Sequence, residues 1–173
     1  MNILAAFKPI RCFALDVDGV LTDGNILLLD DGQQMRRMNI KDGYALQLAI
    51  KKGYHVLVIS GAQSEAVKQR LQKLGVKDVM MGVLHKTAEL EKYLRLHDLK
   101  KEQVLFMGDG MPDHKAMLAV GLPCCPADAV AEIREISHYI SPIKGGEGCV
   151  RDIIEKVLKL NGHWNDDETI AAR

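Results

Sequence analysis

Acidic side chains follow two of the apolar segments of this chain. Asp16 and Asp18 lie at the end of the first such segment, Asp109 follows the apolar residues 104–107, and Asp113 lies one helical turn beyond it. Crowded carboxylates repel one another and are stabilised when a cation sits among them. Oxygen ligands favour a hard ion, so these residues predict a Mg²⁺ site.

A hydroxyl group and an ammonium group occupy comparable positions. Ser60 and Gly61 come at the end of a second apolar segment, and Lys86 follows a third, after Gly82 and His85. A cation, a hydroxyl, an ammonium and loop amides can together cradle a phosphoryl group. An aspartate nucleophile in such a site forms a phosphoaspartate, which divides hydrolysis into two easier steps. A second carboxylic acid two residues away can protonate the leaving oxygen and then deprotonate the attacking water.

Two simpler interpretations compete for these aspartates, a calcium loop and a helix cap. The sequence Asp-x-Asp-Gly also occurs in calcium loops, but the third ligand before the Gly and the later Glu of that pattern are missing here. Asp113 precedes an apolar helical run, so a plain helix cap is an open alternative for this residue.

The spacing of apolar residues predicts the elements that position these groups. Continuous apolar segments are typical of strands buried on both faces, as in a parallel sheet, and here they alternate with helical periodicity. We therefore expect one α/β domain over 1–173, a doubly wound, mostly parallel, Rossmann-like sheet. The expected strands are 12–17, 55–60, 79–81 and 104–107, and the expected helices are 43–52, 64–74, 87–97, 112–120, 128–136 and 150–160.

One segment interrupts this alternation directly after the first strand. Residues 25–29 and 34–39 flank Asp30-Asp31-Gly32, which predicts a β-hairpin inserted at about 25–40. Its side chains are more apolar than an isolated exposed hairpin tolerates. We expect burial against another subunit, with packing on its own domain as the alternative. The polar end of the chain, about 161–173, is expected to fray over 165–173.

Composition excludes several classes of protein. The chain has 173 residues, 47% of them hydrophobic and 27% charged, with a formal net charge of +0. These are ordinary values for a globular domain, and zero net charge gives no basic footprint for nucleic acid or for an anionic membrane. No apolar run approaches the roughly 18 residues of a membrane span, and the start lacks the basic region of a signal peptide. The four cysteines show no paired spacing, so we expect reduced thiols and a cytoplasmic location.

The motifs together resemble those of haloacid dehalogenase-like phosphatases. The residues that carry this resemblance are Asp16-Val-Asp-Gly-Val-Leu-Thr22, Ser60-Gly61, Lys86 and Gly108-Asp-Gly-Met-Pro-Asp113. The chain is most similar to the small branch without a cap domain that acts on 3-deoxy-D-manno-octulosonate 8-phosphate. The hairpin, Asn39-Ile-Lys-Asp-Gly-Tyr44, Gly82-Val-Leu-His-Lys86 and Gly145-Gly-Glu-Gly-Cys-Val-Arg151 extend the resemblance over about 10–160.

The resemblance implies a role for each of these residues. Asp16 would be the nucleophile and Asp18 the general acid and base. Mg²⁺ would bind the carboxylates of Asp16 and Asp109 and the backbone carbonyl of Asp18. The residues expected to contact the phosphorylated sugar acid are Asp18, Ser60, Gly61, Lys86, Asn39 and Lys41, and Asp113 would orient Lys86 or a metal-bound water.

The resemblance also implies an assembly. Members of this branch are typically homotetramers that associate through their hairpins, and a neighbour's glycine-rich tail covers the site in place of a cap. We interpret Gly145-Gly146-Glu147-Gly148 as a mobile loop at such a subunit contact, since no strand feeds it as in a nucleotide-binding fingerprint. The chain departs from its relatives at Gly110, where many have Asp, and at Ala62-Gln63, where an Arg is common.

Several functions follow from these patterns. The leading hypothesis is a Mg²⁺-dependent phosphomonoesterase for 3-deoxy-D-manno-octulosonate 8-phosphate in lipopolysaccharide sugar synthesis, with a nine-carbon 9-phosphate as the alternative substrate. A receiver-type signalling domain would need an Asp after the third strand, where this chain has Met81-Gly82. A non-catalytic oligomeric scaffold would be favoured by loss of Asp16 or Asp18, and both are present.

Overall fold

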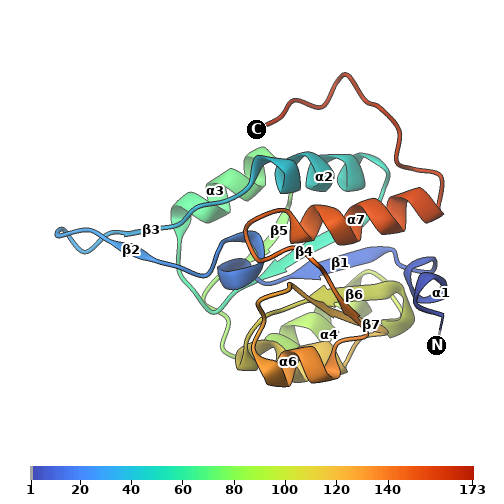
Figure 1. Ribbon diagram of the computed structural model, residues 1–173, viewed down its shortest axis with the longest axis horizontal. Helices are drawn as coiled ribbons and strands as arrows, with labels where there is room; N and C mark the ends of the chain where they lie inside the picture. The colour runs from blue at the N-terminus through green and yellow to red at the C-terminus, as the bar shows by residue number, and fades with distance from the viewer. Residues whose placement is uncertain (1) are drawn as a thin grey trace.

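The computed structural model describes residues 2–173, which form a parallel sheet between two layers of helices (Figure 1). The sheet has the strand order β5-β4-β1-β6-β7-β8, and each neighbouring pair is parallel. This arrangement confirms the predicted α/β class. The strands are β1 (Cys12–Leu15), β4 (His55–Ile59), β5 (Asp78–Met80), β6 (Val104–Met107), β7 (Leu122–Cys125) and β8 (Tyr139–Ile140).

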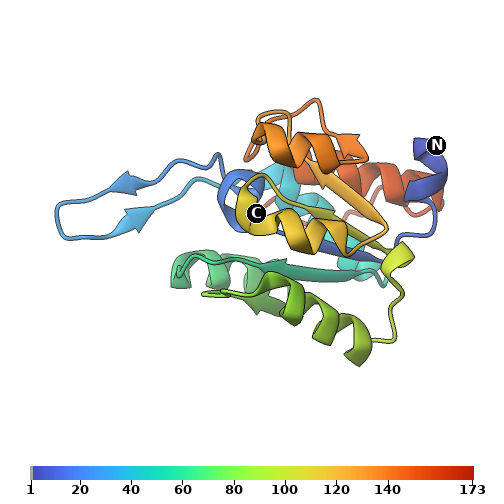
Figure 2. The same cartoon turned by 90° about the horizontal axis from the view of Figure 1, so that it is seen from below.

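The helices divide between the two faces of the sheet, as Figures 1 and 2 show. Side chains of α1, α2, α3 and α7 enter one buried apolar cluster, and those of α4, α5 and α6 enter the other. Every residue of β1 and β6 is fully buried, because helices cover both faces of these central strands. The helices are α1 (Ile3–Phe7), α2 (Ile40–Lys51), α3 (Glu65–Lys73), α4 (Lys86–Leu96), α5 (His114–Leu118), α6 (Ala131–Ile136) and α7 (Cys149–Leu160).

Two strands and one α-helix of the described residues lie outside the predicted elements. Strand β7 contains Pro123, a residue that ordinarily argues against a strand inside a sheet because it lacks an N–H donor. Here the carbonyl of Pro123 still accepts a hydrogen bond, at 2.9 Å, from the backbone N–H of His138. The strand β8 and the helix α1 are only 2 and 5 residues long, too short for a periodic signal.

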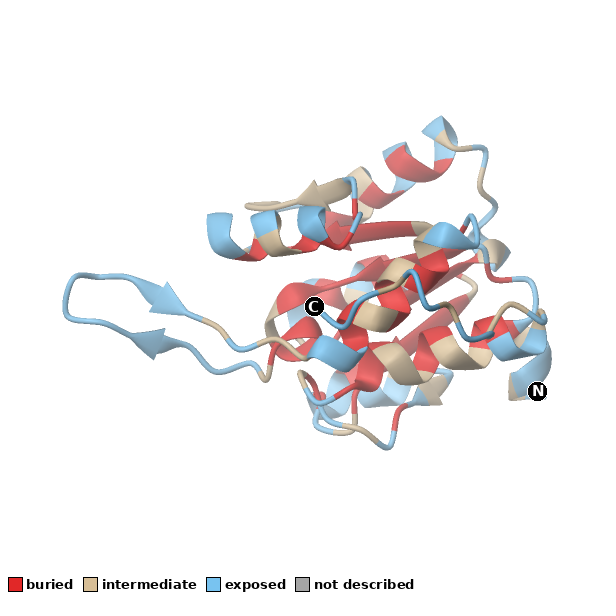
Figure 3. Ribbon diagram, turned by 90° about the horizontal axis from the view of Figure 1, so that it is seen from above, coloured by how far each residue is buried: buried red, intermediate tan, exposed pale blue. Residues whose placement is uncertain are grey.

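The hairpin forms as predicted and projects from the body of the molecule (Figures 2 and 3). It consists of β2 (Leu27–Leu28) and β3 (Gln34–Met35), paired antiparallel, with a bridge between Thr22 and Met38 at its base. Gly32 occupies the turn at φ +85°. The side chain of Leu28 is the most open of the hairpin's apolar groups, at 71% exposure, so this chain alone does not bury the hairpin.

The expectation that the end of the chain frays is wrong. The segment crosses back over α2 (Figure 1), where Gln47 Nε2 donates to the carbonyl of Ala171 at 2.9 Å. Lys51 pairs with Asp167, and the Trp164 ring meets the Tyr44 ring edge-on at 6.1 Å. Polar composition predicted fraying, but backbone carbonyls, Asp167 and the Ile170 side chain dock residues 165–173 on the body of the molecule. Within residues 2–173, none of the helices has the length and apolar character of a membrane span.

Candidate active site

Asp16 follows β1 at the carboxyl edge of the sheet. Its backbone N–H donates to the Met107 carbonyl at 3.1 Å, so β6 holds the residue in place, and it is 8% exposed. Burial raises the pKa of the Asp16 carboxyl to about 6, and the negative charge of Asp113 adds to this effect. The ammonium of Lys86 acts in the opposite direction. Ligands of parallel sheets bind at this edge, where β1 lies between β4 and β6.

The loop after Asp16 makes one wide helical turn, Val17–Leu21, which is broken at Asp18 and Gly19. Gly19 has φ +86°, and a Cβ at this position would lie 1.9 Å from Oδ2 of Asp109. The Thr22 hydroxyl oxygen fastens the turn by accepting from the N–H of Gly19 at 3.3 Å. A glycine is therefore required for Asp109 to lie directly against this loop.

Lys86 is a buried ammonium at the first residue of α4. Its Nζ lies 2.8 Å from Oδ1 of Asp16 and 2.6 Å from Oδ1 of Asp113. Burial alone would lower the pKa of this ammonium, but the two carboxylates outweigh burial and hold the pKa above its usual value. Helix α4 thus brings a cation to the carboxylates of two other segments.

Asp113 organises the loop that precedes α5. Its Oδ2 accepts from the backbone N–H groups of Asp109, at 3.1 Å, and Gly110, at 3.3 Å. A Cβ on Gly108 would lie 2.5 Å from the Asp113 Cβ, so Gly108 gives this side chain its space. The side chain makes no capping hydrogen bond to α5. It does accept from the Gly110 N–H at the start of the short helical turn Met111–Asp113, so the capping alternative holds for that turn. Capping is not its whole role, because the other oxygen of the carboxylate binds Lys86.

Asp109 supplies the third carboxylate of the cluster. Burial raises its pKa to about 7, and the charges of Asp16 and Asp113 add to this effect. One oxygen each from Asp16, Asp109 and Asp113 lies within 4.8 Å of the others. Both oxygens of Asp113 already bind other groups, which leaves Asp16 and Asp109 with free oxygens in an acidic, oxygen-only site. This donor set fits a hard divalent cation such as Mg²⁺.

Ser60 reaches the same sheet edge from β4. Its side chain is buried, and Oγ accepts from the Ala62 N–H at 3.1 Å, which leaves the hydroxyl proton free to donate. The Ser60 side chain is thus bonded to its own loop after β4, whereas the Asp16 side chain is bonded to Lys86. Gly61 follows it at the surface. The nearest atom to a Cβ built on Gly61 is the Val83 carbonyl oxygen at 3.6 Å, an ordinary contact, so space does not require glycine here.

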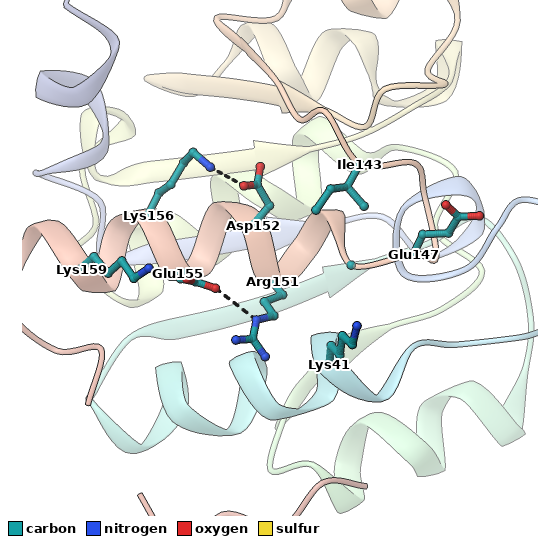
Figure 4. Close-up of a pocket in the computed structure, with 9 residues that line it drawn as sticks. Lys41, Ile143, Glu147, Arg151, Asp152, Glu155, Lys156 and Lys159 are labelled. Carbon is teal, nitrogen blue, oxygen red and sulfur yellow. Dashed lines mark hydrogen bonds and ion pairs between the residues drawn. The ribbon is translucent and has the colours of Figure 1, made fainter. Parts of the chain in front are cut away.

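Asn39 and Lys41 serve other local purposes in the structure. Asn39 is the N-cap of α2, and its Oδ1 accepts from the Lys41 backbone N–H at 2.8 Å. The Lys41 side chain lines a pocket that runs along α7, from Arg151 to Lys159 (Figure 4). Arg151 and Glu155 pair there at 3.1 Å, so the charges of this pocket largely neutralise one another. A substrate contact by Asn39 or Lys41 stays a prediction.

One residue that contacts the site aspartates was not predicted from the sequence. Arg36, which follows β3 of the hairpin, donates from Nε to Oδ1 of Asp18 at 2.6 Å and from Nη2 to Oδ2 at 3.2 Å. Its side chain is 4% exposed. The pattern of the hairpin indicated only that alternate residues face opposite sides, and which side faces the site depends on the fold.

The glycine-rich segment before α7 packs on its own chain. A Cβ on Gly145 would lie 1.8 Å from the Gly19 carbonyl oxygen, and the Gly146 N–H donates to the Val20 carbonyl at 2.9 Å. The Gly145 N–H donates to Asp128 Oδ1 at 2.9 Å. Gly145 and Gly146 are therefore needed for close approach to the loop that carries Asp18, while a mobile loop at a subunit contact stays a prediction.

Known proteins share this arrangement. No protein-family model matches the chain. A 3-deoxy-D-manno-octulosonate 8-phosphate phosphatase of Yersinia pestis is 32% identical over 165 residues, covering 93% of this chain and 88% of the relative. The chain belongs to the 3-deoxy-D-manno-octulosonate 8-phosphate phosphatase family. A phosphatase of the same name from Escherichia coli K12 is 31% identical and is covered over 88% of its length.

Solved structures agree with this family. The crystal structure of the Yersinia pestis phosphatase matches with a TM-score of 0.92 at 29% identity, covering 99% of this chain and 91% of that one. The phosphatase from Moraxella catarrhalis, solved in complex with magnesium, phosphate and KDO, matches with a TM-score of 0.88 at 30% identity over 92% and 91% of the two chains. The resemblance to haloacid dehalogenase-like phosphatases is confirmed. As a member of this family the chain is a phosphoric monoester hydrolase. Its carboxylate cluster fits the magnesium ion with which the Moraxella catarrhalis phosphatase was solved.

Proposed function

We propose that this chain hydrolyses 3-deoxy-D-manno-octulosonate 8-phosphate to the free sugar acid and phosphate, a step of lipopolysaccharide sugar biosynthesis. The observation that carries the proposal is the buried contact of Lys86 with Asp16 and Asp113, beside Asp18 and Asp109, at the carboxyl edge of the sheet. The relatives that share nearly the whole chain carry this name.

In the first half of the reaction, Asp16 is the nucleophile. One of its carboxylate oxygens forms a bond to phosphorus while the ester P–O bond breaks, and the electron pair of that bond goes to the ester oxygen. Asp18 donates its proton to this oxygen, so the sugar leaves as a neutral alcohol. The Asp16 carboxylate keeps a free oxygen for this attack, because its hydrogen bond to Lys86 uses only Oδ1.

In the second half, water releases the phosphate. The Asp18 carboxylate takes a proton from the water as the water oxygen attacks phosphorus, and the bond between Asp16 and phosphorus breaks. Asp16 returns as a carboxylate and Asp18 as an acid, ready for the next substrate. The same residue serves both halves because it lies two positions from the nucleophile on a turn held by Thr22.

Lys86 and Ser60 hold the phosphoryl group in this proposal. The Lys86 ammonium remains charged and already contacts Asp16 at 2.8 Å, so it can stabilise negative charge that moves onto the phosphoryl oxygens. The free proton of the Ser60 hydroxyl can be donated to the same group. Asp113 positions Lys86 and stays away from the reacting atoms.

Asp16, Asp109 and the backbone carbonyl of Asp18 would hold Mg²⁺. When bound, the ion supplies positive charge that offsets the carboxylates and the phosphoryl oxygens. The raised pKa values of Asp16, to about 6, and Asp109, to about 7, have burial and carboxylate crowding as their causes. A cation at this position relieves both, which supports the assignment.

A nine-carbon sugar acid 9-phosphate is the alternative substrate. The chain has Ala62-Gln63 where relatives commonly carry an Arg, and the Gln63 amide instead covers Gly82, where a Cβ would lie 2.1 Å from its Nε2. Neither Gln63 nor the expected sugar contacts Asn39 and Lys41 distinguish an eight-carbon from a nine-carbon sugar acid, so the nine-carbon ester is kept as the alternative.

The proposal includes a homotetramer that associates through the hairpins, with the end of a neighbouring chain covering the site. The apolar hairpin side chains support this association, since Leu27 is 61% and Leu28 is 71% exposed. We assign the enzyme to the cytoplasm, because all four cysteines are free and buried, the state that a reducing compartment preserves.

Phosphate release from a panel of esters tests the function. Purified protein with Mg²⁺ is offered octulosonate 8-phosphate, nononate 9-phosphate, N-acetylneuraminate 9-phosphate and hexose phosphates. We expect kcat/KM to favour the octulosonate by tenfold or more, about 1.4 kcal/mol in transition-state binding. A preference for a nine-carbon ester would keep the mechanism and replace the substrate. Asp16→Asn is the matched control, and activity in that variant would refute the covalent route.

A further inference from the structure

The hairpin sends one cationic side chain back into the body of the molecule. Arg36 and Arg37 are neighbours on the segment that follows β3 and returns from the hairpin tip, and their side chains reach different partners. The Arg37 side chain is 84% exposed and pairs with Asp23, whereas the Arg36 side chain is 4% exposed and pairs with Asp18. The contact of Arg36 therefore differs in kind from that of a surface arginine.

The contact between Arg36 and Asp18 uses both oxygens of the carboxylate. Nε donates to Oδ1 at 2.6 Å and Nη2 donates to Oδ2 at 3.2 Å, so the planar guanidinium faces the carboxylate edge to edge. Such a two-bond pair fixes the direction of the carboxylate as well as its position, which an ammonium group does not do. Asp18 otherwise stands on a loop with a broken helical turn, where its side chain could rotate.

The base of the hairpin keeps Arg36 at this position. Thr22 and Met38 form a bridge close to Arg36, and Thr22 belongs to the same loop as Asp18. The Thr22 hydroxyl oxygen accepts from the N–H groups of Gly19, at 3.3 Å, and Gly24, at 3.2 Å. The loop of Asp18 and the strand of Arg36 are therefore tied together at two places, by backbone and by the ion pair.

We infer that Arg36 is a positioning residue for Asp18, so that the hairpin is part of the catalytic apparatus as well as a projecting arm. The inference rests on the role of Asp18 in the proposed function. When Asp18 gives its proton to the ester oxygen, the carboxylate that remains is held by the two guanidinium bonds. The same contact fixes the direction in which Asp18 gives its proton to the ester oxygen, so its loss slows release of a leaving group that needs protonation.

Leaving-group chemistry distinguishes this role from a merely structural one. An alkyl ester such as a sugar phosphate needs protonation as the P–O bond breaks, whereas p-nitrophenyl phosphate releases a stable phenolate and needs little. We expect Arg36→Met to slow alkyl release by about 10- to 100-fold in a single turnover. Nitrophenol release in a single turnover should change less than about threefold, since general acid catalysis contributes little to it. Arg36→Lys should recover part of the loss, because it restores charge without the two-bond geometry.

The controls separate this inference from the proposed function. Arg37→Met removes a neighbouring arginine of the same strand and should leave both rates unchanged. In the Asp18→Asn background, Arg36→Met should cause no further loss, as expected for residues that act as a unit. Equal losses on both esters, additive losses in the double variant, or no loss in Arg36→Met would overturn the inference. A normal alkyl rate in Asp18→Asn would instead refute the role of Asp18, on which the proposed function depends.

Discussion

The ammonium of Lys86 lies 2.6 Å from Oδ1 of Asp113, and the two side chains are only 5% and 1% exposed. The other oxygen of Asp113 accepts from the backbone N–H groups of Asp109 and Gly110. One carboxylate therefore holds both the cation at the start of α4 and the loop that carries Asp109. Loss of Asp113 would leave Lys86 with Asp16 as its remaining partner and would leave the two backbone N–H groups without their acceptor.

Replacement of Asp113 by Ala should affect stability and activity together. We expect the free energy of unfolding to fall by about 1.5–3 kcal/mol, since Lys86 loses one of its two partners and the N–H groups of Asp109 and Gly110 lose their acceptor. Urea unfolding and kcat measurements check this. The control is Glu155→Ala, which removes a surface partner of Arg151 and Lys159 and should cost less than about 1 kcal/mol. Similar costs for the two variants would show that the buried pair contributes no special stability.

Gly19→Ala should remove activity through Asp109. A methyl group at this position would lie 1.9 Å from Asp109 Oδ2, so the carboxylate must move away from its place in the cluster. We expect Mg²⁺ affinity and kcat to fall while the far-UV circular dichroism spectrum stays native. Gly53→Ala is the matched control, since Gly53 has φ +84° and no atom within 4 Å of its Cβ position. Both variants carry a backbone strain of about 1–2 kcal/mol, so an equal loss of Mg²⁺ affinity in both would contradict the steric argument.

The positions of the carboxylates could be predicted because each depends on a local rule. Asp16, Ser60 and Asp109 follow continuous apolar strands, and the carboxyl ends of parallel strands share one edge of a sheet. Lys86 could be predicted as a site residue because it follows the third strand after a short loop. The structure confirms the parallel sheet and brings Lys86 into contact with Asp16.

Other features depend on contacts that no local pattern contains. Arg36 faces Asp18 only because of how the hairpin leaves the sheet, and strand β7 was hidden by Pro123. The glycines before α7 indicated flexibility, yet position 145 has no room for a side chain because the Gly19 carbonyl oxygen approaches it closely. The roles of residues that are distant in sequence but in contact in space can be assigned only once the fold is known.

The stability of the metal-free protein should fall as pH rises. The pKa values of Asp16 and Asp109 are raised to about 6 and about 7, by burial first and then by neighbouring carboxylates. In the unfolded chain an Asp titrates near pH 4, so between about pH 4 and 7 the folded state binds more protons. The free energy of unfolding therefore decreases over this interval. Thermal unfolding in EDTA across this range measures the effect.

Mg²⁺ should reverse this trend, because it binds the ionised carboxylates in place of protons. The increase in Tm on adding Mg²⁺ is expected to be larger at about pH 7.5 than at about pH 5.5. Asp109→Asn should abolish most of the Mg²⁺ effect and flatten the pH dependence. Some slope should remain, since burial also raises the pKa values of Asp16 and Asp42 to about 6. A Mg²⁺ effect that is independent of pH would contradict the assignment of these ligands.

Truncation after His163 should destabilise the chain itself. It removes the Trp164 ring, which meets Tyr44 edge-on at 6.1 Å and lies 5.2 Å from the Arg151 guanidinium. We expect a loss of about 1–2 kcal/mol from these aromatic and cation–π contacts. Truncation after Asn165 keeps Trp164 and should cost less. The sequence predicts that loss of the tail affects activity more than folding. An unchanged Tm with a reduced kcat would favour that view, in which the tail covers a neighbour's site.

The hairpin should control assembly. Leu27 and Leu28 are adjacent on an extended strand, so their side chains point to opposite faces, and they are 61% and 71% exposed. Apolar groups on both faces favour contacts on both sides, as in a closed ring of subunits. We expect the wild type to sediment as a tetramer and the double variant Leu27→Lys, Leu28→Lys as a smaller species. Leu96→Lys, at a 77% exposed position at the end of α4, is the control and should leave the assembly intact. A monomeric wild type, or a double variant that remains tetrameric, would refute assembly through the hairpin.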